Sequence, residues 1–164
     1  MHNHAPEGYL CPFCLIIQSA ENERISTLQN DVIYRTAWVT AVIGSHQWPN
    51  NPGNTLIIPN EHFENIYDLP THYGEKIQAA AHRLALAMKQ AYHCAGVSLR
   101  QHNEPAGNQD VWRYHAHITP RYENDGLYAS LLSHRALMPP EERTQYAARL
   151  RAALSGGSQE VSQQ

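Results

Sequence analysis

The residues best suited to chemistry in this chain are Arg113, His115 and His117, which alternate with mostly apolar residues across 112–118. Successive side chains of a β-strand point to opposite faces, so these three would share one face with neighbours about 7 Å apart. The apolar residues between them suit a face that packs on a core. We therefore expect a strand to hold a row of imidazoles, which can act as nucleophile, general acid or metal ligand. Spacing alone leaves these roles open.

Two amide side chains precede this row in the sequence. Asn103 begins a polar loop at 103–108 that contains proline and glycine, and Gln109 follows that loop. Because the loop leads into the predicted strand, we expect both amides beside the same strand end as the histidines. Such a cluster favours a functional site over two histidines that face solvent by chance.

A Cys-x-x-Cys pair, Cys11 and Cys14, is the second candidate site. Two thiolates at this spacing can bind zinc, and the same spacing is typical of thioredoxin-like redox proteins. The redox interpretation expects a strand before the pair, and residues 8–10 are too short to form one. A zinc site needs further ligands, for which His62 is a candidate. Two half-buried structural cysteines are the remaining alternative.

The scaffold is predicted from hydrophobic periodicity and turn residues. Three- and four-residue apolar spacing predicts a long helix over 71–95, and a second helix is expected over 141–154. The expected strands are two within 31–43, one at 55–58, one at 97–101 and one at 111–119, with a loop at 47–53 and a short helix or turn at 11–18. This pattern predicts an α+β fold with a mostly antiparallel sheet, one long helix and a C-terminal helix. We expect a single domain over 1–154 and a disordered tail over 155–164.

Composition excludes several classes of protein. The 164 residues carry a formal charge of only −3, without a run of lysine or arginine, which argues against a nucleic-acid-binding surface. No apolar run is long enough to cross a bilayer, and the first residues do not resemble a signal peptide. Three cysteines, an odd number, argue against a disulfide framework. We therefore expect a cytoplasmic protein with no nucleic-acid or membrane partner.

Three stretches, in matching order, resemble the histidine-triad (HIT) family of nucleotide-binding hydrolases and transferases, related to galactose-1-phosphate uridylyltransferase. They are Gly53–Asn65, the loop with Asn103 and 107–111, and His115–Tyr122. The Cys-x-x-Cys pair resembles the zinc-bearing branch of that family. The resemblance implies a homodimer that attacks the α-phosphate of a nucleotide, such as a nucleoside phosphoramidate or a dinucleoside polyphosphate.

The resemblance also implies roles for individual residues. His115 matches the middle histidine of His-x-His-x-His, which forms a covalent nucleotidyl-histidine intermediate. His117 matches the last histidine, which contacts the phosphate and the departing group, and Asn103 and Gln109 match amides that hold phosphate oxygens. A neutral imidazole is a good nucleophile toward phosphorus near pH 7. The alternatives are a non-catalytic nucleotide- or metal-binding protein with the same fold, and a metal-dependent hydrolase with His115 and His117 as ligands.

Arg113 departs from the family pattern, because it stands where the first histidine of the triad is expected. In the zinc-bearing branch that histidine is the fourth ligand, beside residues that match Cys11, Cys14 and His62. A guanidinium has no lone pair to offer a metal. Either a three-residue zinc site remains, closed by water or another histidine (His2, His4 or His102), or zinc is lost.

Arg113 can instead serve the substrate. At about 7 Å from His115 and an effective dielectric near 20, its charge would disfavour the imidazolium by at most about 2 kcal/mol. It would supply a phosphate donor at the same time. A second departure is Asp110, which stands where relatives carry a small hydroxyl residue near the phosphate. A carboxylate there opposes an anion unless it points away or binds another donor.

Overall fold

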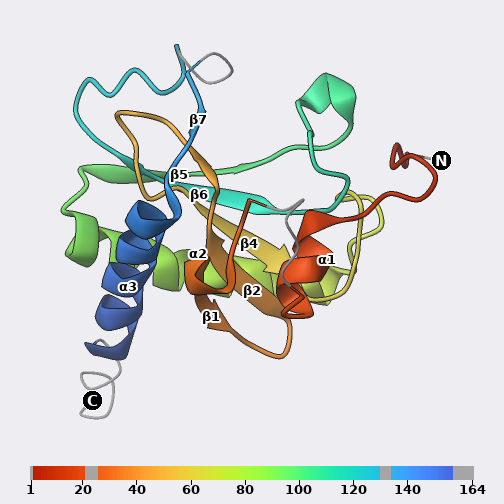
Figure 1. The fold of residues 1–164 in the computed structure, drawn as a ribbon, viewed down its shortest axis with the longest axis horizontal. Coiled ribbons are helices and arrows are strands. Elements are labelled where there is room, and N and C mark those ends of the chain that lie inside the picture. The colour runs from red at the N-terminus through yellow and green to blue at the C-terminus, as the bar shows by residue number, and fades with distance from the viewer. Residues whose placement is uncertain (1, 21–25, 130–133, 157–164) are drawn as a thin grey trace.

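The computed structural model describes residues 2–20, 26–129 and 134–156, and a five-stranded antiparallel sheet forms its centre (Figure 1). In spatial order the strands are β1 (Val32–Arg35), β2 (Val39–Ile43), β4 (Thr55–Pro59), β6 (Ala116–Arg121) and β5 (Gly96–Gln101). Every residue of β2 and β4 is buried, because both strands are central and both faces of the sheet are covered. The predicted α+β fold with an antiparallel sheet is confirmed.

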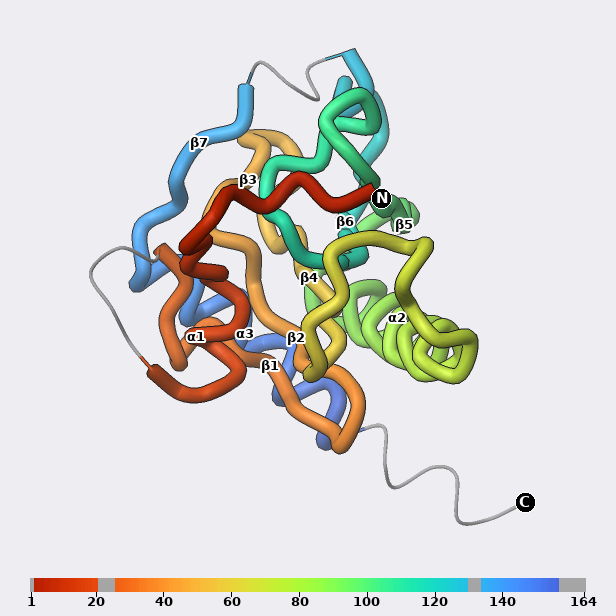
Figure 2. Tube along the Cα trace, turned by 90° about the vertical axis from the view of Figure 1, so that its right-hand side faces the viewer, coloured from red at the N-terminus to blue at the C-terminus, as the bar shows by residue number. Residues whose placement is uncertain are grey.

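The helices cover the two faces of the sheet unequally. The long helix α2 (Thr71–Tyr92) and the later helix α3 (Pro140–Gly156) pack on one face, and the short α1 (Pro12–Ile17) packs on the other. Figure 2 shows the sheet between α1 and α2. The alternation of β2 follows this division, since Ala41 joins the core under α2 whereas Val42 joins the cluster under α1. No helix among the described residues has both the length and the apolar character needed to span a membrane.

One residue of the region predicted as a loop at 47–53, Gln47, differs from that prediction. β3 (His46–Gln47) pairs with β7 (Ala136–Leu137) in a separate two-stranded sheet, and Met138 N donates to Ser45 O at 2.9 Å. Gln47 is therefore a strand residue. A strand of two residues is too short to show the alternation from which strands are predicted. This small sheet brings the segment that begins at 134 toward the strands that carry the histidines.

The strand predicted over 111–119 begins later than expected. β6 starts at Ala116, because the preceding backbone groups bond to loops rather than to a neighbouring strand. Arg113 N donates to Val111 O at 2.7 Å, and Tyr114 N donates to Phe63 O at 2.6 Å. The prediction is therefore wrong for 111–115. The apolar face expected for this segment is nevertheless buried in the main core, through Tyr114, Ala116 and Ile118.

A buried ion pair joins α3 to the short 3-10 helix Gln29–Asp31. Arg143 Nε lies 3.0 Å from Asp31 Oδ2, and both side chains are only 1% exposed. The same guanidinium donates to Met138 O at 2.7 Å and to Ser26 O at 2.6 Å. These bonds satisfy a charge that would otherwise be costly to bury. Of the tail predicted at 155–164, the first two residues belong to α3, and 157–164 lie outside the described residues.

One glycine is required by its surroundings. Gly53 precedes β4 with φ +96°, a conformation that other residues rarely adopt. A Cβ at this position would lie 2.6 Å from Cε2 of Tyr92, the last residue of α2. The turn into β4 can therefore pass close to the end of α2 only as glycine.

Candidate active site

His115 lies immediately before β6 and presents one ring nitrogen for chemistry. Its Nδ1 is 2.8 Å from the backbone oxygen of Arg113, which can only accept a hydrogen bond. Nδ1 therefore carries the proton, and Nε2 keeps its lone pair. The ring packs edge-on against Phe13 of α1, with centroids 5.0 Å apart, and lies 4.9 Å from the ring of His117. These contacts fix the orientation of a potential nucleophile.

His117 is the second residue of β6 and is held by a different set of bonds. The hydroxyl of Thr119 donates to Asn54 Oδ1 at 2.8 Å, which turns the amide nitrogen of Asn54 toward His117. That nitrogen lies 3.5 Å from His117 Nδ1. A donor facing Nδ1 favours the tautomer with the proton on Nε2, so His117 can donate a hydrogen bond to a bound group.

Burial keeps both imidazoles neutral. His115 is 4% and His117 is 8% exposed, and removal from water lowers the pKa of each ring because it disfavours the charged form. The pKa of His117 falls well below its ordinary value, since the neighbouring His115 and Arg100 add to the burial. Both rings are consequently uncharged near pH 7, which is the state that a nucleophile requires.

Two adjacent cavities open beside these rings, and His117 lines both. The first, which we call the His115 cavity, has a volume of about 250 Å³, and its wall includes Phe13, Gly44, Asn54, Leu56, His115 and His117. The second, the Arg100 cavity, has about 270 Å³, and its wall includes Trp48, Arg100, His102, Gln109, His117 and Arg135. Trp48, Asp110 and Arg135 also line both. The two histidines thus stand where a ligand that spans both cavities would pass.

The two predicted amides differ in where they lie. Gln109 is buried on the wall of the Arg100 cavity, but its side chain is already bonded, to Glu104 N at 2.7 Å and Glu64 O at 2.6 Å. Asn103 lines neither cavity; its Oδ1 accepts from Ile66 N at 2.7 Å. The structure therefore brings Gln109, but not Asn103, to the histidines.

Four polar or aromatic residues of the cavity walls are among those that sequence reasoning missed. Arg100 is the register partner of His117 on β5, and Arg135 comes from the segment just before β7. Trp48 and Asn54 come from the turn between β3 and β4. Of these four, Arg100 carried a usable signal, because it lies on a predicted strand on the opposite face from the apolar residues Val97 and Leu99. The other three depend on how distant loops pack.

Asp110 binds another donor, as a carboxylate beside an anion site must. Its Oδ2 lies 2.7 Å from Nη2 of Arg135, and the guanidinium holds the pKa of this carboxyl below its usual value despite partial burial. Burial is the largest cause of the lowered pKa of His115, and the charge of Arg135 adds a smaller lowering, whereas the hydrogen bond to the backbone oxygen of Arg113 raises this pKa. A residue outside the sequence motif thus contributes to the electrostatics of His115.

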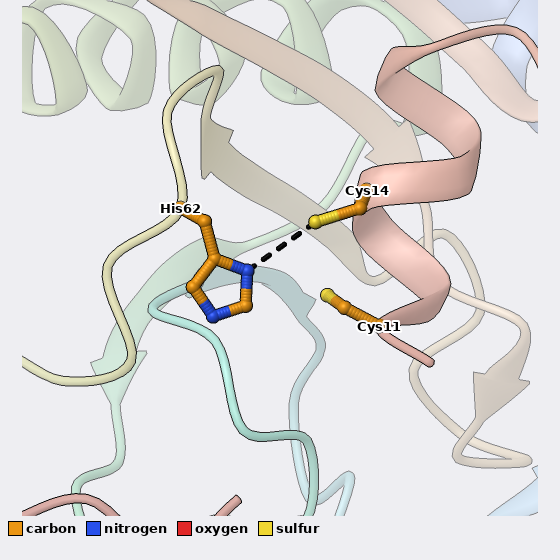
Figure 3. A group of neighbouring side chains, drawn as sticks. All are labelled: Cys11, Cys14 and His62. Carbon is orange, nitrogen blue, oxygen red and sulfur yellow. Dashed lines mark hydrogen bonds between the residues drawn. The ribbon is translucent and has the colours of Figure 1, made fainter. Parts of the chain in front are cut away.

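The predicted metal ligands lie together. The sulfurs of Cys11 and Cys14 and a ring nitrogen of His62 are all within 4.8 Å of one another (Figure 3). Cys14 Sγ is 3.3 Å from His62 Nδ1. Burial lowers the pKa of His62, which leaves its ring neutral, as a metal ligand must be. Within the described part of the chain, His2, His4 and His102 do not join this cluster.

Arg113 fills the fourth side of this cluster. Its Nη1 donates to Cys14 Sγ at 2.8 Å, and its Nη2 donates to the carbonyl oxygens of Pro59, Asn60 and Glu61 at 2.7, 3.0 and 3.1 Å. The side chain is 1% exposed and lines neither cavity. A structural zinc ion needs four donors, and here the fourth side holds a cation without a lone pair. The residues present do not fit a closed four-ligand zinc site.

Comparison with known proteins agrees with this geometry. The HIT domain matches residues 26–124. Protein hit of Bacillus subtilis is 29% identical over 133 residues, which cover 80% of this chain and 86% of that protein. An adenosine 5'-monophosphoramidase of Saccharomyces cerevisiae is 30% identical over 118 residues, or 71% of this chain and 66% of that protein. The zinc-bound histidine triad protein of Mycobacterium smegmatis superimposes with a TM-score of 0.72 at 24% identity, covering 90% of this chain and 95% of that one.

The chain therefore belongs to the histidine-triad (HIT) domain family. Two of its relatives are named for hydrolysis of nucleotide derivatives: the adenosine 5'-monophosphoramidase of Saccharomyces cerevisiae and an adenylylsulfatase of Arabidopsis thaliana.

Proposed function

We propose that this protein is a nucleotide hydrolase or transferase that acts at an α-phosphate through a nucleotidyl-histidine intermediate on His115. The observation that carries the proposal is the hydrogen bond from His115 Nδ1 to the backbone oxygen of Arg113, which leaves the lone pair on Nε2. That ring lines a cavity that it shares with a second neutral imidazole, His117. Nucleoside phosphoramidates and dinucleoside polyphosphates are the substrates that the resemblance suggests.

The proposed reaction has two displacements. Nε2 of His115 forms a bond to the α-phosphorus while the bond from phosphorus to the leaving group breaks, and the leaving group takes the electron pair. The Nε2–H of His117 donates a hydrogen bond to that group as its negative charge develops. Water, or another acceptor, then attacks the nucleotidyl group and passes its proton to the solvent, while the phosphorus–nitrogen bond breaks and its electron pair returns to Nε2 of His115. Fixed positions of both rings favour this chemistry, since phosphoryl transfer depends mainly on positioning and charge.

The test is a covalent adduct. On rapid mixing with a nucleoside phosphoramidate or a dinucleoside polyphosphate, intact-mass measurement should detect the protein plus one nucleotidyl group. The adduct should be absent from His115→Ala and present in His82→Ala, which changes an exposed histidine of α2. Nucleotide binding without any adduct or turnover would favour the non-catalytic alternative, and activity abolished by a chelator would favour the metal-dependent one.

A second part of the proposal concerns the metal cluster. We propose that the guanidinium of Arg113 joins α1 to the loop after β4 without a bound zinc ion. In this arrangement its four described contacts link Cys14 to the backbone at 59–61. Cys11, Cys14 and His62 remain a potential three-donor set, and the effect of Arg113→His on zinc binding is developed below.

We propose that the protein is a homodimer located in the cytoplasm. Edge strand β5 exposes two apolar side chains, Val97 at 37% and Leu99 at 47%, which would be covered if two copies paired as a homodimer. Light scattering of wild type and Leu99→Lys tests this, with a dimer expected only for the wild type.

The three cysteines are unpaired, which suits a reducing cytoplasm. We also propose that 1–154 forms one domain.

A further inference from the structure

Arg100 is a charged residue of the site to which the two-step mechanism gives no role. It lies on β5 directly opposite His117 of β6, and it lines the Arg100 cavity. Its guanidinium stacks on Trp48, with Cζ 5.0 Å from the ring centroid. Its Nε and Nη2 atoms are buried and have no hydrogen-bond partner. A buried donor without a partner is unfavourable unless a ligand completes it.

The charge of the cavity points to the kind of ligand. Across 2–20, 26–129 and 134–156, no carboxylate forms an ion pair with Arg100. Asp110 faces the same cavity, but it is paired with Arg135. Two guanidinium groups against one carboxylate leave one net positive charge. A planar guanidinium with free donors in a partly dry site is suited to a phosphate group.

The position of the cavity relative to the nucleophile decides which phosphate it would hold. His115 lines only the first cavity, whereas His117 lines both. A phosphorus atom within reach of His115 would therefore have the Arg100 cavity on the far side of His117. In-line attack by Nε2 of His115 expels the leaving group on the side of the phosphorus opposite the nucleophile, and the Arg100 cavity is the space beyond His117 that can receive it.

We propose that Arg100 forms a subsite for a second phosphate, on the leaving-group side of the phosphate that His115 attacks. The proposal rests on the proposed function and makes its substrate class narrower: phosphoric anhydrides are favoured over phosphoramidates. When Nε2 bonds to the α-phosphorus, the bond to the bridging oxygen breaks, and that oxygen keeps the electron pair. The departing phosphate gains one negative charge, which Arg100 compensates through its free Nε and Nη2 donors.

The first experiment compares kcat/KM for a dinucleoside polyphosphate and a nucleoside phosphoramidate. Arg100→Met keeps an unbranched side chain over Trp48 but removes the charge. The anhydride-to-phosphoramidate ratio should fall at least tenfold in this variant. The matched control is Arg83→Met, because Arg83 also stacks on an aromatic ring, 5.2 Å from the centroid of Tyr34, but lies outside both cavities. An unchanged ratio in Arg100→Met overturns the subsite.

The second experiment does not depend on turnover. Titration calorimetry with pyrophosphate and with orthophosphate should show pyrophosphate binding at least tenfold tighter to wild type than to Arg100→Met. Arg100→Lys should recover part of the loss, and Arg100→Gln replaces the methionine variant if that one does not fold. If wild type cleaves neither nucleotide, the proposed function fails, yet pyrophosphate binding still decides the subsite. Equal pyrophosphate affinity in wild type and variant overturns it.

Discussion

Arg113→His should convert the Arg113-filled cluster into a zinc site. The substitution removes the guanidinium from the sulfur of Cys14 and adds a ring nitrogen on the fourth side of the three donors. Cys11, Cys14 and His62 then have the partner that a tetrahedral zinc ion needs. Zinc binding becomes coupled to folding, because the donors come together only in the folded chain.

The size of the effect follows from the bonds that are lost. Arg113 makes one bond to sulfur and shares the two hydrogens of Nη2 among three carbonyls. We count about three charge-assisted bonds and subtract the cost of burying the charge. On this basis the free energy of unfolding of metal-free Arg113→His should fall by about 3–5 kcal/mol. For a chain of this size that corresponds to a fall in Tm of about 6–20 °C. Zinc at a thousand times its Kd should return about 4 kcal/mol.

The assay is thermal unfolding with zinc and with chelator, together with metal content after dialysis. Arg113→His should retain one zinc per chain and regain most of its lost Tm, whereas wild type should show little change. Arg113→Gln is the control, since it loses the same bonds but supplies no ring nitrogen. The reasoning is refuted if wild type retains stoichiometric zinc, or if zinc stabilises Arg113→Gln as much as Arg113→His.

Three further predictions follow from burial and close contacts. Because burial lowers the pKa of His115, its reactive neutral form persists as the pH falls to 6.5, and kcat/KM should decline only below that pH. A decline in kcat/KM that begins above pH 7 would contradict this expectation. Gly53→Ala should destabilise the fold by about 1–3 kcal/mol in urea titrations, because the methyl meets Tyr92; wild-type stability would disprove the clash. Arg143→Met should lower the free energy of unfolding by about 3–5 kcal/mol at pH 7, because Asp31 stays buried without its counter-charge. The loss should be smaller at pH 3, where that carboxyl is protonated, and an equal loss at both pH values would contradict an electrostatic cause.

The sequence predicted the scaffold well where periodicity was long. The helix expected at 71–95 is α2, Thr71–Tyr92, because its apolar positions repeat over six turns. The strand expected at 111–119 was placed too early, since alternation also occurs in extended chain whose backbone bonds go elsewhere. Arg113 and Tyr114 bond to Val111 and Phe63, and these contacts leave no trace in local sequence.

The site was predictable only in part. His115 and His117, which are two positions apart in the sequence, could be placed together because a short extended segment fixes their separation. Neither the direction of the Arg113 side chain, away from the cavities, nor the arrival of Arg135 at Asp110 could be predicted. Both depend on tertiary packing, in which a long side chain selects among partners distant in sequence.

The Arg143–Asp31 pair has a consequence for how the chain folds during synthesis. Asp31 precedes β1, and its partner is translated 112 residues later. In a nascent chain that has emerged only as far as β6, this carboxylate keeps its bond from Leu28 N but lacks its counter-charge, so burying it there costs about 3–5 kcal/mol. Arrival of α3 removes that cost, which favours completion of this part of the core as a late event.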